Sequence, residues 1–287
     1  MRLVPNWLMG ASLASVAGNS RGQLKPPWPD LIIGAGQRSV PAARWVQQQS
    51  GGRTKIVFLG RPRAPLKWFD LVVTTPQYGL PPASNVAQVL LPYVAPIAAP
   101  EDLAHWLEAW RDLARPLTAV LVGSSHSAQV LDQDSIEGVV TLARQVAGDG
   151  GVIFLTSPRT SAEEAGTLSI AAAGVGEVVR WQQGAPNPHF ALLDQADRFV
   201  VTEDSVSMIA EAVSTGKPVH VAQMTRRPAI NWQADAGVMG ALARHGVLSP
   251  PRDVRRLVEM LAANDVVEYA GVAPNDRHGG GFAEWAE

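Results

Sequence analysis

The sequence predicts an α/β protein with two Rossmann-like lobes, each built on a parallel sheet. Short, almost continuously apolar segments such as DLIIGAG and LTAVLVGSS recur along the chain. They alternate with segments of helical periodicity, and glycines or prolines separate the two kinds. Strands that are apolar on both faces are typical of parallel sheets covered by helices, because a sheet open to water would alternate polar and apolar residues.

The composition of the chain excludes several kinds of binding partner and active site. The chain has 287 residues, 46% of them hydrophobic, which is enough to bury a substantial core in one large or two ordinary domains. Its net charge is −2 and its basic residues are scattered, so we expect no nucleic-acid partner. The absence of cysteine excludes disulfides, zinc-thiolate sites and thiol catalysis, and fits a reducing compartment.

The first twenty residues, MRLVPNWLMGASLASVAGNS, partly imitate a signal peptide through one arginine, an apolar run and small residues near Ala17. Pro5 and Asn6 interrupt this run, so we expect an amphipathic segment of the folded protein instead. No run approaches the roughly 20 apolar residues that span a bilayer, so no transmembrane segment is predicted.

The first predicted domain, residues 1–115, is an α/β lobe with a connecting helix. DLIIGAG predicts a strand, and SVPAARWVQQQSGG predicts a helix that Gly51 and Gly52 end. KIVFLG and FDLVVTT predict two more strands. The stretch from Leu90 to Pro116 contains several prolines and then a helix rich in leucine and tryptophan, which predicts a connection followed by a packing helix.

The second predicted domain, residues 116–250, repeats the alternation of strand and helix. Its strands are LTAVLVGSS, GVIFLTSPRT, EVVRW, RFVVT and PVHVA, and its helices include SIEGVVTLARQVAGDGG, SAEEAGTLSIAAAG and PHFALLDQAD. Residues 251–287 predict a helix with prolines at its start, followed by a Gly-rich tail that we expect to be mobile beyond Gly271. Because ligands of parallel sheets bind beyond the carboxyl ends of the strands, the loops there are the candidate sites.

The stretch RFVVTEDSVSMIAEAVSTGKPVHVA, residues 198–222, has more polar side chains than packing requires. A helix from about Asp204 to Thr215 places one apolar stripe on the sheet. That stripe consists of Val206, Ile209, Ala210 and Val213. The polar turn and the opposite face hold the candidate ligand-binding residues Thr202, Glu203, Asp204, Ser205, Ser207 and Glu211.

These residues suit a nucleoside diphosphate. Its phosphates would lie against the free N–H groups at the start of the helix, and Glu211 could accept hydrogen bonds from both ribose hydroxyls. The alternative is that Asp204 or Ser205 only caps the helix and that Glu211 is an ordinary solvated residue. Two carboxylates beside a diphosphate would repel it, so the site also needs a cation.

Arg159 in LTSPRT follows another strand of the second lobe, and its guanidinium matches phosphate oxygens. It could equally be a surface arginine in a turn. Further candidate cleft residues occupy two other turns after strands: Gly123, Ser124 and His126 in one, and Gly34, Gly36 and Arg38 in the other. The second turn lacks the third glycine of a dinucleotide fingerprint, and no phosphate-loop or metal-binding motif occurs, so neither a cofactor nor a metal is predicted.

Several of these segments together resemble one family. They are PDLIIGAGQRSVPAARWV, FDLVVTTPQYGLP, LTSPRT, NPHFALLDQAD and VVTEDSVSMIAEAVSTGKPVHV. The chain resembles bacterial proteins related to the plant mitochondrial-fission "elongated mitochondria" factor, a family commonly described as glycosyltransferases of GT-B fold. The resemblance covers roughly Pro29 to Val258, and DSVSMIAEA followed by TGKPV is its most specific part.

The resemblance implies a nucleotide-sugar site in the second lobe, formed by Asn187, Arg159 and the turn and helix from Thr202 to Glu211, with Glu211 on the ribose and Arg159 near the diphosphate. It implies an acceptor site in the first lobe and no bound metal. The acceptor stays open between a lipid-linked and a surface glycan. Related chains usually open with a strand and a turn resembling DGRPGHxNQ, so we expect the first lobe to be incomplete.

The sequence and the resemblance leave three candidate functions. The leading one is a glycosyltransferase, expected in the cytoplasm or at the periphery of the inner membrane. The alternative is a non-catalytic scaffold that keeps the two-lobed fold. A nucleotide-sugar epimerase of the short-chain dehydrogenase type is less favoured, because Tyr78, Tyr93 and Tyr269 lack the lysine four residues later that this chemistry needs.

Overall fold

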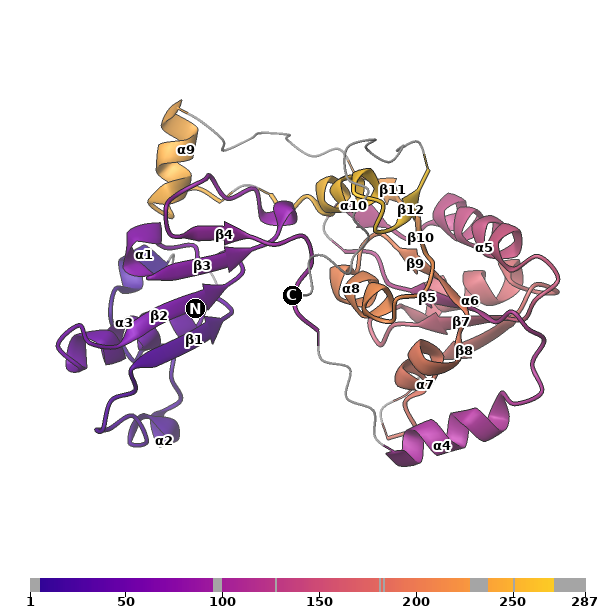
Figure 1. The fold of residues 1–287 in the computed structure, drawn as a ribbon, viewed down its shortest axis with the longest axis horizontal. Coiled ribbons are helices and arrows are strands. Elements are labelled where there is room, and N and C mark those ends of the chain that lie inside the picture. The colour runs from indigo at the N-terminus through magenta and orange to yellow at the C-terminus, as the bar shows by residue number, and fades with distance from the viewer. Residues whose placement is uncertain are drawn as a thin grey trace. The chain divides into compact units, whose positions relative to one another are not determined.

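The computed structural model describes residues 6–94, 100–126, 128–180, 182, 184–227, 237–249 and 251–270 (Figure 1). The chain forms two compact units. Unit 1 consists of residues 1–90 and 230–253, and unit 2 consists of residues 91–229 and 254–287. The tail predicted to be mobile and residues 228–236 lie outside the described residues. The domain boundaries expected at residues 115 and 250 stay predictions.

Unit 1 contains a parallel sheet of four strands in the order β1-β2-β3-β4. These strands are β1 Leu31–Ala35, β2 Lys55–Leu59, β3 Leu71–Thr74 and β4 Val86–Gln88. The helices of unit 1 are α1 Asn6–Met9, α2 Gly18–Arg21, α3 Ser39–Gln49 and α9 Gly237–Arg244, with the short 3-10 turns η1 Leu66–Trp68 and η2 Pro76–Tyr78. Strand β4 and helix α9 were not predicted from the sequence.

The two faces of the unit 1 sheet differ. Ile56, Phe58 and Val72 point to one face and form a buried cluster with Val40 and Ala43 of α3. Leu31, Ile33 and Leu59 point to the other face because side chains alternate along a strand, and they are 50%, 64% and 45% exposed. The core of unit 1 therefore lies on the α3 side of its sheet.

Unit 2 contains a parallel sheet of six strands in the order β12-β10-β9-β5-β7-β8. These strands are β5 Thr118–Val122, β7 Val152–Thr156, β8 Glu177–Arg180, β9 Arg198–Thr202, β10 Val219–Ala222 and β12 Glu268–Tyr269. Every residue of β5 and β7 is buried, as their continuous apolar sequences predict. A small antiparallel pair joins β6 Gln129–Val130 to β11 Thr225–Arg226.

Helices of unit 2 follow the strands in chain order. They are α4 Pro100–Ala109, α5 Gln133–Ala147, α6 Ala162–Ala171, α7 Pro188–Gln195, α8 Val206–Ser214 and α10 Val254–Ala263. Asp132 caps α5 through Ser135 N–H, and Ser161 with Glu164 forms a capping box at α6. The α/β class with two parallel sheets is confirmed.

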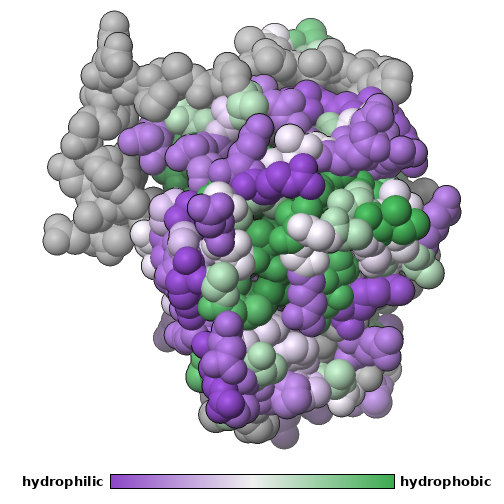
Figure 2. All heavy atoms as spheres, turned by 90° about the vertical axis from the view of Figure 1, so that its right-hand side faces the viewer, coloured by the Kyte–Doolittle hydropathy of each residue, from purple (hydrophilic) through white to green (hydrophobic). Residues whose placement is uncertain are grey.

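The outer side of α5, α6 and β8 is not uniformly polar. Figure 2 views the right-hand side of Figure 1 and shows hydrophobic side chains gathered in the middle of that face, between hydrophilic margins. Partly buried side chains pack on the core cluster of unit 2 from α5, α6 and the segment through β8: Leu142, Val146, Ala171, Val175 and Val178. None of the described helices combines the length and apolar character needed to cross a bilayer.

Candidate functional site

Two neighbouring strands of unit 2 end side by side and bring together four of the predicted residues. Strands β5 and β9 pair in parallel, so their carboxyl ends share one edge of the sheet. The N–H of Gly123 donates to Thr202 Oγ1 at 2.8 Å, and that hydroxyl donates to Asp204 Oδ1 at 2.7 Å. The N–H of Ser124 donates to Asp204 Oδ2 at 3.1 Å. The turns after β5 and β9 therefore form one buried polar network.

Position 123 requires glycine because the Asp204 carboxylate occupies the space that a larger side chain would need. A Cβ atom at this position would lie 2.1 and 2.2 Å from the two carboxylate oxygens of Asp204, so no larger residue fits without moving that side chain. Burial raises the pKa of Asp204, while hydrogen bonds from Thr202 and Ser124 and the charge of Arg159 oppose the rise. The network holds a carboxyl group that burial shifts toward its neutral form.

Arg159 lies close to this network. It follows β7, the other neighbour of β5, and its side chain is exposed. Its positive charge opposes the rise that burial causes in the pKa of Asp204. Thr160 Oγ1 donates to the carbonyl of Gly123 at 2.6 Å, which ties the Arg159 turn to the turn after β5. A third strand end thus joins the same edge.

Helix α8 begins at this edge with no side-chain cap. Ser205 occupies the N-cap position, but its hydroxyl lies 3.4 Å from Ser207 Oγ and caps no N–H group. No acidic residue lies in the first turn. The predicted apolar stripe of α8 is confirmed as buried, although the helix begins at Val206 rather than at Asp204. The N–H groups of its first turn keep the positive end of the helix dipole open to an anion.

Glu211 pairs with a residue that sequence reasoning did not identify. His189 Nε2 lies 2.8 Å from Glu211 Oε2, and the two side chains are 17% and 24% exposed. Asn187 caps α7 by accepting a hydrogen bond from the His189 N–H at 3.0 Å. The predicted residues Asn187 and Glu211 are thus linked through His189. The signal available in the sequence was Asn-Pro-His at a helix start. Asn187 is the N-cap, Pro188 is the first residue of the helix, and His189 follows in its first turn.

Glu203 has a different environment from the other predicted residues. Its carboxylate is fully buried, accepts hydrogen bonds from Arg255 Nη2 at 3.0 Å and Tyr269 OH at 2.6 Å, and lies 3.3 Å from the Met224 N–H. Burial would lower the pKa of Arg255, but the hydrogen bond and charge of Glu203 raise it above its usual value. Burial and Glu203 likewise raise the pKa of Tyr269. Glu203 therefore anchors α10 and β12 to β9.

The remaining predicted residues are spread over both units. His126 forms an isolated backbone bridge with Gln129 and its side chain is exposed. In unit 1, Gly34 lies within β1 beside Ser39, and Gly36 adopts φ 76° in the turn to α3. Arg38 follows that turn and lines a cavity. Among the described residues, no group of three or more His, Asp or Glu side chains could hold a metal ion.

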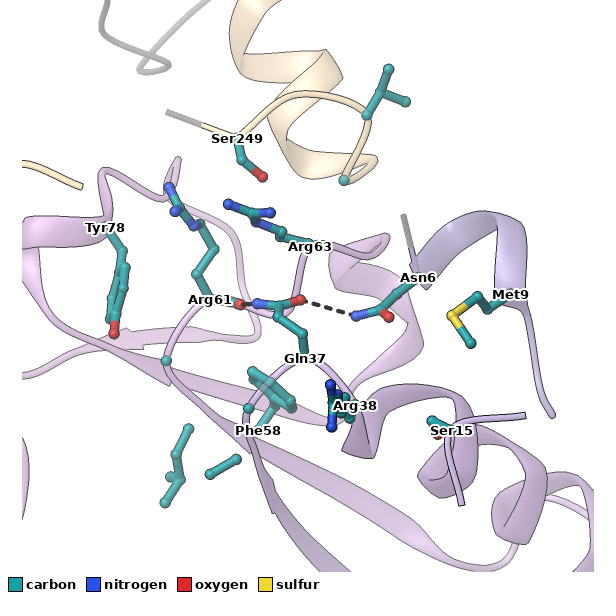
Figure 3. A pocket seen from close by; sticks show the side chains of 16 residues that line it. Asn6, Met9, Ser15, Gln37, Arg38, Phe58, Arg61, Arg63, Tyr78 and Ser249 are labelled. Atoms are coloured by element: carbon teal, nitrogen blue, oxygen red, sulfur yellow. Dashed lines mark hydrogen bonds between the residues drawn. The ribbon is translucent and has the colours of Figure 1, made fainter. Parts of the chain in front are cut away.

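This unit 1 cavity lies beyond the carboxyl ends of β1 and β2 and has a volume of about 1070 Å³ (Figure 3). Three arginines line it: Arg38 after β1, and Arg61 and Arg63 after β2. Tyr78, Phe58 and Ser249 are also part of its wall. Sequence reasoning noticed Arg38 but not the other two arginines, although GRPR directly follows the strand KIVFL.

Comparison with known proteins supports the resemblance seen in the sequence. The model of a family described as "Mitochondrial fission ELM1" matches residues 1–273. The mitochondrial fission protein ELM1 of Arabidopsis thaliana is 27% identical over 240 residues, which are 75% of this chain and 56% of that protein. The aligned part thus spans little more than half of that relative.

Solved structures give weaker matches. A glycosyltransferase from Rickettsia africae aligns with 10% identity and a TM-score of 0.40 over 83% of this chain and 76% of its own. Anabaena HepE, solved in complex with UDP and glucose, aligns with 12% identity and a TM-score of 0.43 over 89% and 83%. At TM-scores below 0.5, neither match bears on what this chain binds.

Proposed function

Since the chain belongs to the mitochondrial fission ELM1 family, whose model covers residues 1–273, we propose that it is a glycosyltransferase that uses a nucleoside-diphosphate sugar bound by unit 2. One observation carries this proposal: Arg159 follows β7, α8 starts without a side-chain cap after β9, and Glu211 within α8 pairs with His189 at the start of α7. The proposed site residues are Arg159, Asn187, Thr202, Asp204, Ser205, Ser207 and Glu211, with His189 added by the structure.

The spacing along α8 suits a nucleotide. From Ser205 to Glu211 the helix rises about 9 Å at 1.5 Å per residue, a span comparable to the separation of a diphosphate from the ribose hydroxyls. The diphosphate would lie against the N–H groups of the first turn, where the helix dipole favours negative charge. The ribose would then lie beside Glu211.

The pair with His189 prepares Glu211 for this role. The hydrogen bond occupies Oε2, and no described residue donates to Oε1. The pairing holds the carboxylate in one orientation, so less side-chain entropy is lost when a ribose hydroxyl donates to it. Asn187 contributes indirectly, because its cap fixes the start of α7 on which His189 lies.

The two acids before α8 need not repel a diphosphate. The charge of Glu203 is balanced by Arg255 within the protein interior. Asp204 faces the Thr202 hydroxyl and the Ser124 N–H, and burial raises its pKa. Both carboxyl groups thus interact with partners inside unit 2. The charges that face a ligand are then those of Arg159 and of the helix N-terminus, which are positive.

In the proposed reaction an acceptor hydroxyl forms a bond to the anomeric carbon of the donor sugar while the bond from that carbon to the diphosphate breaks. Negative charge collects on the leaving diphosphate, and Arg159 and the N–H groups of α8 stabilise it. These groups take the part that a divalent cation has in other transferases, so we propose that transfer proceeds without a bound metal. Use of a nucleotide sugar would place the reaction in the cytoplasm, with a lipid-linked or surface glycan as acceptor.

A second candidate is a non-catalytic binding protein. The observation that favours it is the name of the Arabidopsis relative, which assigns that protein to mitochondrial fission. Such a protein would bind a nucleotide through the same residues without releasing a sugar. Turnover therefore separates the two candidates.

The test combines turnover with one matched pair of variants. Wild type is incubated with UDP-, GDP-, ADP- and CDP-sugars and a broad set of glycan and lipid acceptors, and the released nucleotide and the sugar products are measured. Glu211→Gln removes the proposed ribose contact, and loss of a charge-assisted hydrogen bond should weaken donor binding roughly 10- to 100-fold. Glu137→Gln, an exposed acid on α5, should change nothing.

Sugar transfer that falls with Glu211→Gln supports the glycosyltransferase. Binding without turnover across the whole set would favour the scaffold, and interconversion of sugar epimers would favour an epimerase. Equal donor binding by the two variants would contradict the assignment of the unit 2 site.

A further inference from the structure

The arginine cavity of unit 1 has an unusual charge balance. Arg38, Arg61 and Arg63 line it, and none of the described lining residues is acidic. No described carboxylate lies within ion-pair distance of Arg38 or Arg63. Elsewhere in the same unit the basic side chains of Arg53 and Lys55 pair with Asp30 and Asp70. The cavity thus holds at least two guanidinium groups, those of Arg38 and Arg63, that no described carboxylate pairs with.

Two of the three guanidinium groups lie close to each other. Figure 3 shows those of Arg61 and Arg63 extending in the same direction, toward Ser249. The pKa of Arg61 is lowered to about 10, mainly by burial and also by the charges of Arg63 and Arg252, while Tyr78 acts in the opposite direction. Like charges held together in a partly desolvated site repel each other, and a bound anion removes that repulsion.

The backbone of the loop is held in the conformation that gathers these arginines. Arg63 has φ 46°, in the left-handed region that residues other than glycine avoid. Asn6 Nδ2 donates to the carbonyl of Pro62 at 2.8 Å, and Gln37 Nε2 donates to the carbonyl of Arg61. Asn6 also donates to Gln37 Oε1 at 3.0 Å, as drawn in Figure 3. A strained turn supported by the buried amide of Asn6 and the half-buried amide of Gln37 is a preorganised site.

A segment distant in sequence forms part of the cavity wall. Gly246, after α9, approaches the backbone of Ala64 so closely that a Cβ atom there would lie 2.6 Å from it. Val247 and Ser249 then add to the wall. The cavity is at least as large as those that hold drug-sized ligands, which measure about 300–1,000 Å³. A free inorganic ion would therefore fill only a small part of it.

We propose that this cavity binds a phosphate group of a larger molecule, which in the glycosyltransferase proposed above is the acceptor. Several guanidinium forks suit a phosphate dianion, because each fork can donate two parallel hydrogen bonds to its oxygens. Phe58, Tyr78 and Met9 give the rest of the wall an apolar character that suits the body of such a molecule. Its role as acceptor rests on the proposed function, whereas phosphate binding in unit 1 does not.

The test is calorimetric titration of the full-length protein with inorganic phosphate and with pyrophosphate at constant ionic strength. Arg63→Gln should weaken binding by about tenfold or more, the effect of losing a charged donor. Arg53→Gln is the matched control, because it removes the same charge from a mainly exposed arginine of the same unit. It should leave the affinity unchanged within about twofold. Arg63→Lys, which keeps the charge and loses the fork, should fall between the two.

A second arm identifies the source of the phosphate. Co-sedimentation with phosphatidylcholine vesicles, with and without phosphatidic acid, shows whether a phosphate on a membrane lipid is bound. Binding to phosphatidic acid that Arg63→Gln abolishes assigns a lipid-linked molecule, and binding in solution alone assigns a soluble one. Thermal unfolding of each variant shows that unit 1 remains folded.

The proposal is overturned if the wild type shows no saturable binding of phosphate or pyrophosphate, or if Arg63→Gln and Arg53→Gln bind equally. Failure of the unit 2 proposal has a different signature. In that case nucleotides would not bind or Glu211→Gln would have no effect, while phosphate binding would still depend on Arg63.

Discussion

The strand ends of the two units use charge in opposite ways. In unit 2 the acids that follow β9 are engaged inside the protein, Glu203 with Arg255 and Asp204 with Thr202 and the Ser124 N–H. In unit 1 the arginines that follow β1 and β2 line an open cavity with no described acid. The type of residue at a strand end therefore does not reveal whether a ligand can bind there, because the groups that pair with each charged side chain decide it.

Both regions also depend on a glycine, but for different reasons. Gly123 of unit 2 leaves room for the carboxylate of Asp204. Gly36 of unit 1 has open space around its Cβ position and adopts φ 76°. One turn is therefore limited by packing and the other by backbone conformation.

The largest expected effect is on the Glu203 contact. Glu203→Gln should lower the free energy of unfolding by about 3 kcal/mol, near the lower end for breaking a buried ion pair, because Arg255 keeps 27% exposure. Glu268→Gln is the control: Glu268 pairs with His220 but is 76% exposed, so its loss should cost about 0–1 kcal/mol. Urea unfolding followed by tryptophan fluorescence measures both. Equal stability of the two variants would contradict a structural role for Glu203.

The next effect concerns the glycines. Gly123→Ala should cost about 1–3 kcal/mol through overpacking against Asp204 and should also weaken nucleotide binding. Gly138→Ala on α5 has open space and should stabilise unit 2 by about 0.5–1 kcal/mol.

Gly36→Ala in unit 1 should cost about 1–2 kcal/mol from its φ alone, and Gly36→Asn less, because asparagine tolerates the left-handed region. The same urea titration compares all four variants. A Gly123→Ala protein as stable as the wild type would show that the Asp204 network is not tightly packed.

The smallest effect is the pH dependence of Asp204. Its folded pKa lies above the unfolded value of 3.8, so the folded state binds more protons and stability falls as pH rises from 3.8 through the folded pKa. Asp204→Asn lacks this titration. The stability of the wild type minus that of Asp204→Asn should therefore be greater at pH 4 than at pH 7. A difference that grows with pH would mean that the network stabilises the charged carboxylate.

The fold was largely predictable because the core strands are short apolar runs. Apart from Thr118 and Thr156, the residues of β5 and β7 are apolar, and all of them are buried in the structure. Strand β4, with the sequence VAQ, is too short and too polar to be recognised without its parallel partner β3. Helix α9 belongs to unit 1 although unit 2 precedes it in the chain, and sequence order carries no sign of this return.

The candidate site was predictable only in part, because its key pairs are distant in sequence. The turn after β9 stood out through its hydroxyl and acidic residues. The partners that define their roles lie far away: Arg255 is 52 residues from Glu203, and His189 is 22 residues from Glu211. The arginine cavity was missed because Arg61 and Arg63 form a site only with Arg38 and the distant Ser249 segment.

The central claim is that unit 2, and not the arginine cavity of unit 1, binds the nucleotide. Calorimetric titration of UDP, GDP, ADP and CDP into wild type, Glu211→Gln and Arg63→Gln shows which unit holds the nucleotide. We expect saturable binding of at least one of them by the wild type, retained affinity in Arg63→Gln and a roughly 10- to 100-fold loss in Glu211→Gln. If Arg63→Gln abolishes nucleotide binding and Glu211→Gln leaves it intact, the nucleotide binds in unit 1, which would contradict its assignment to unit 2.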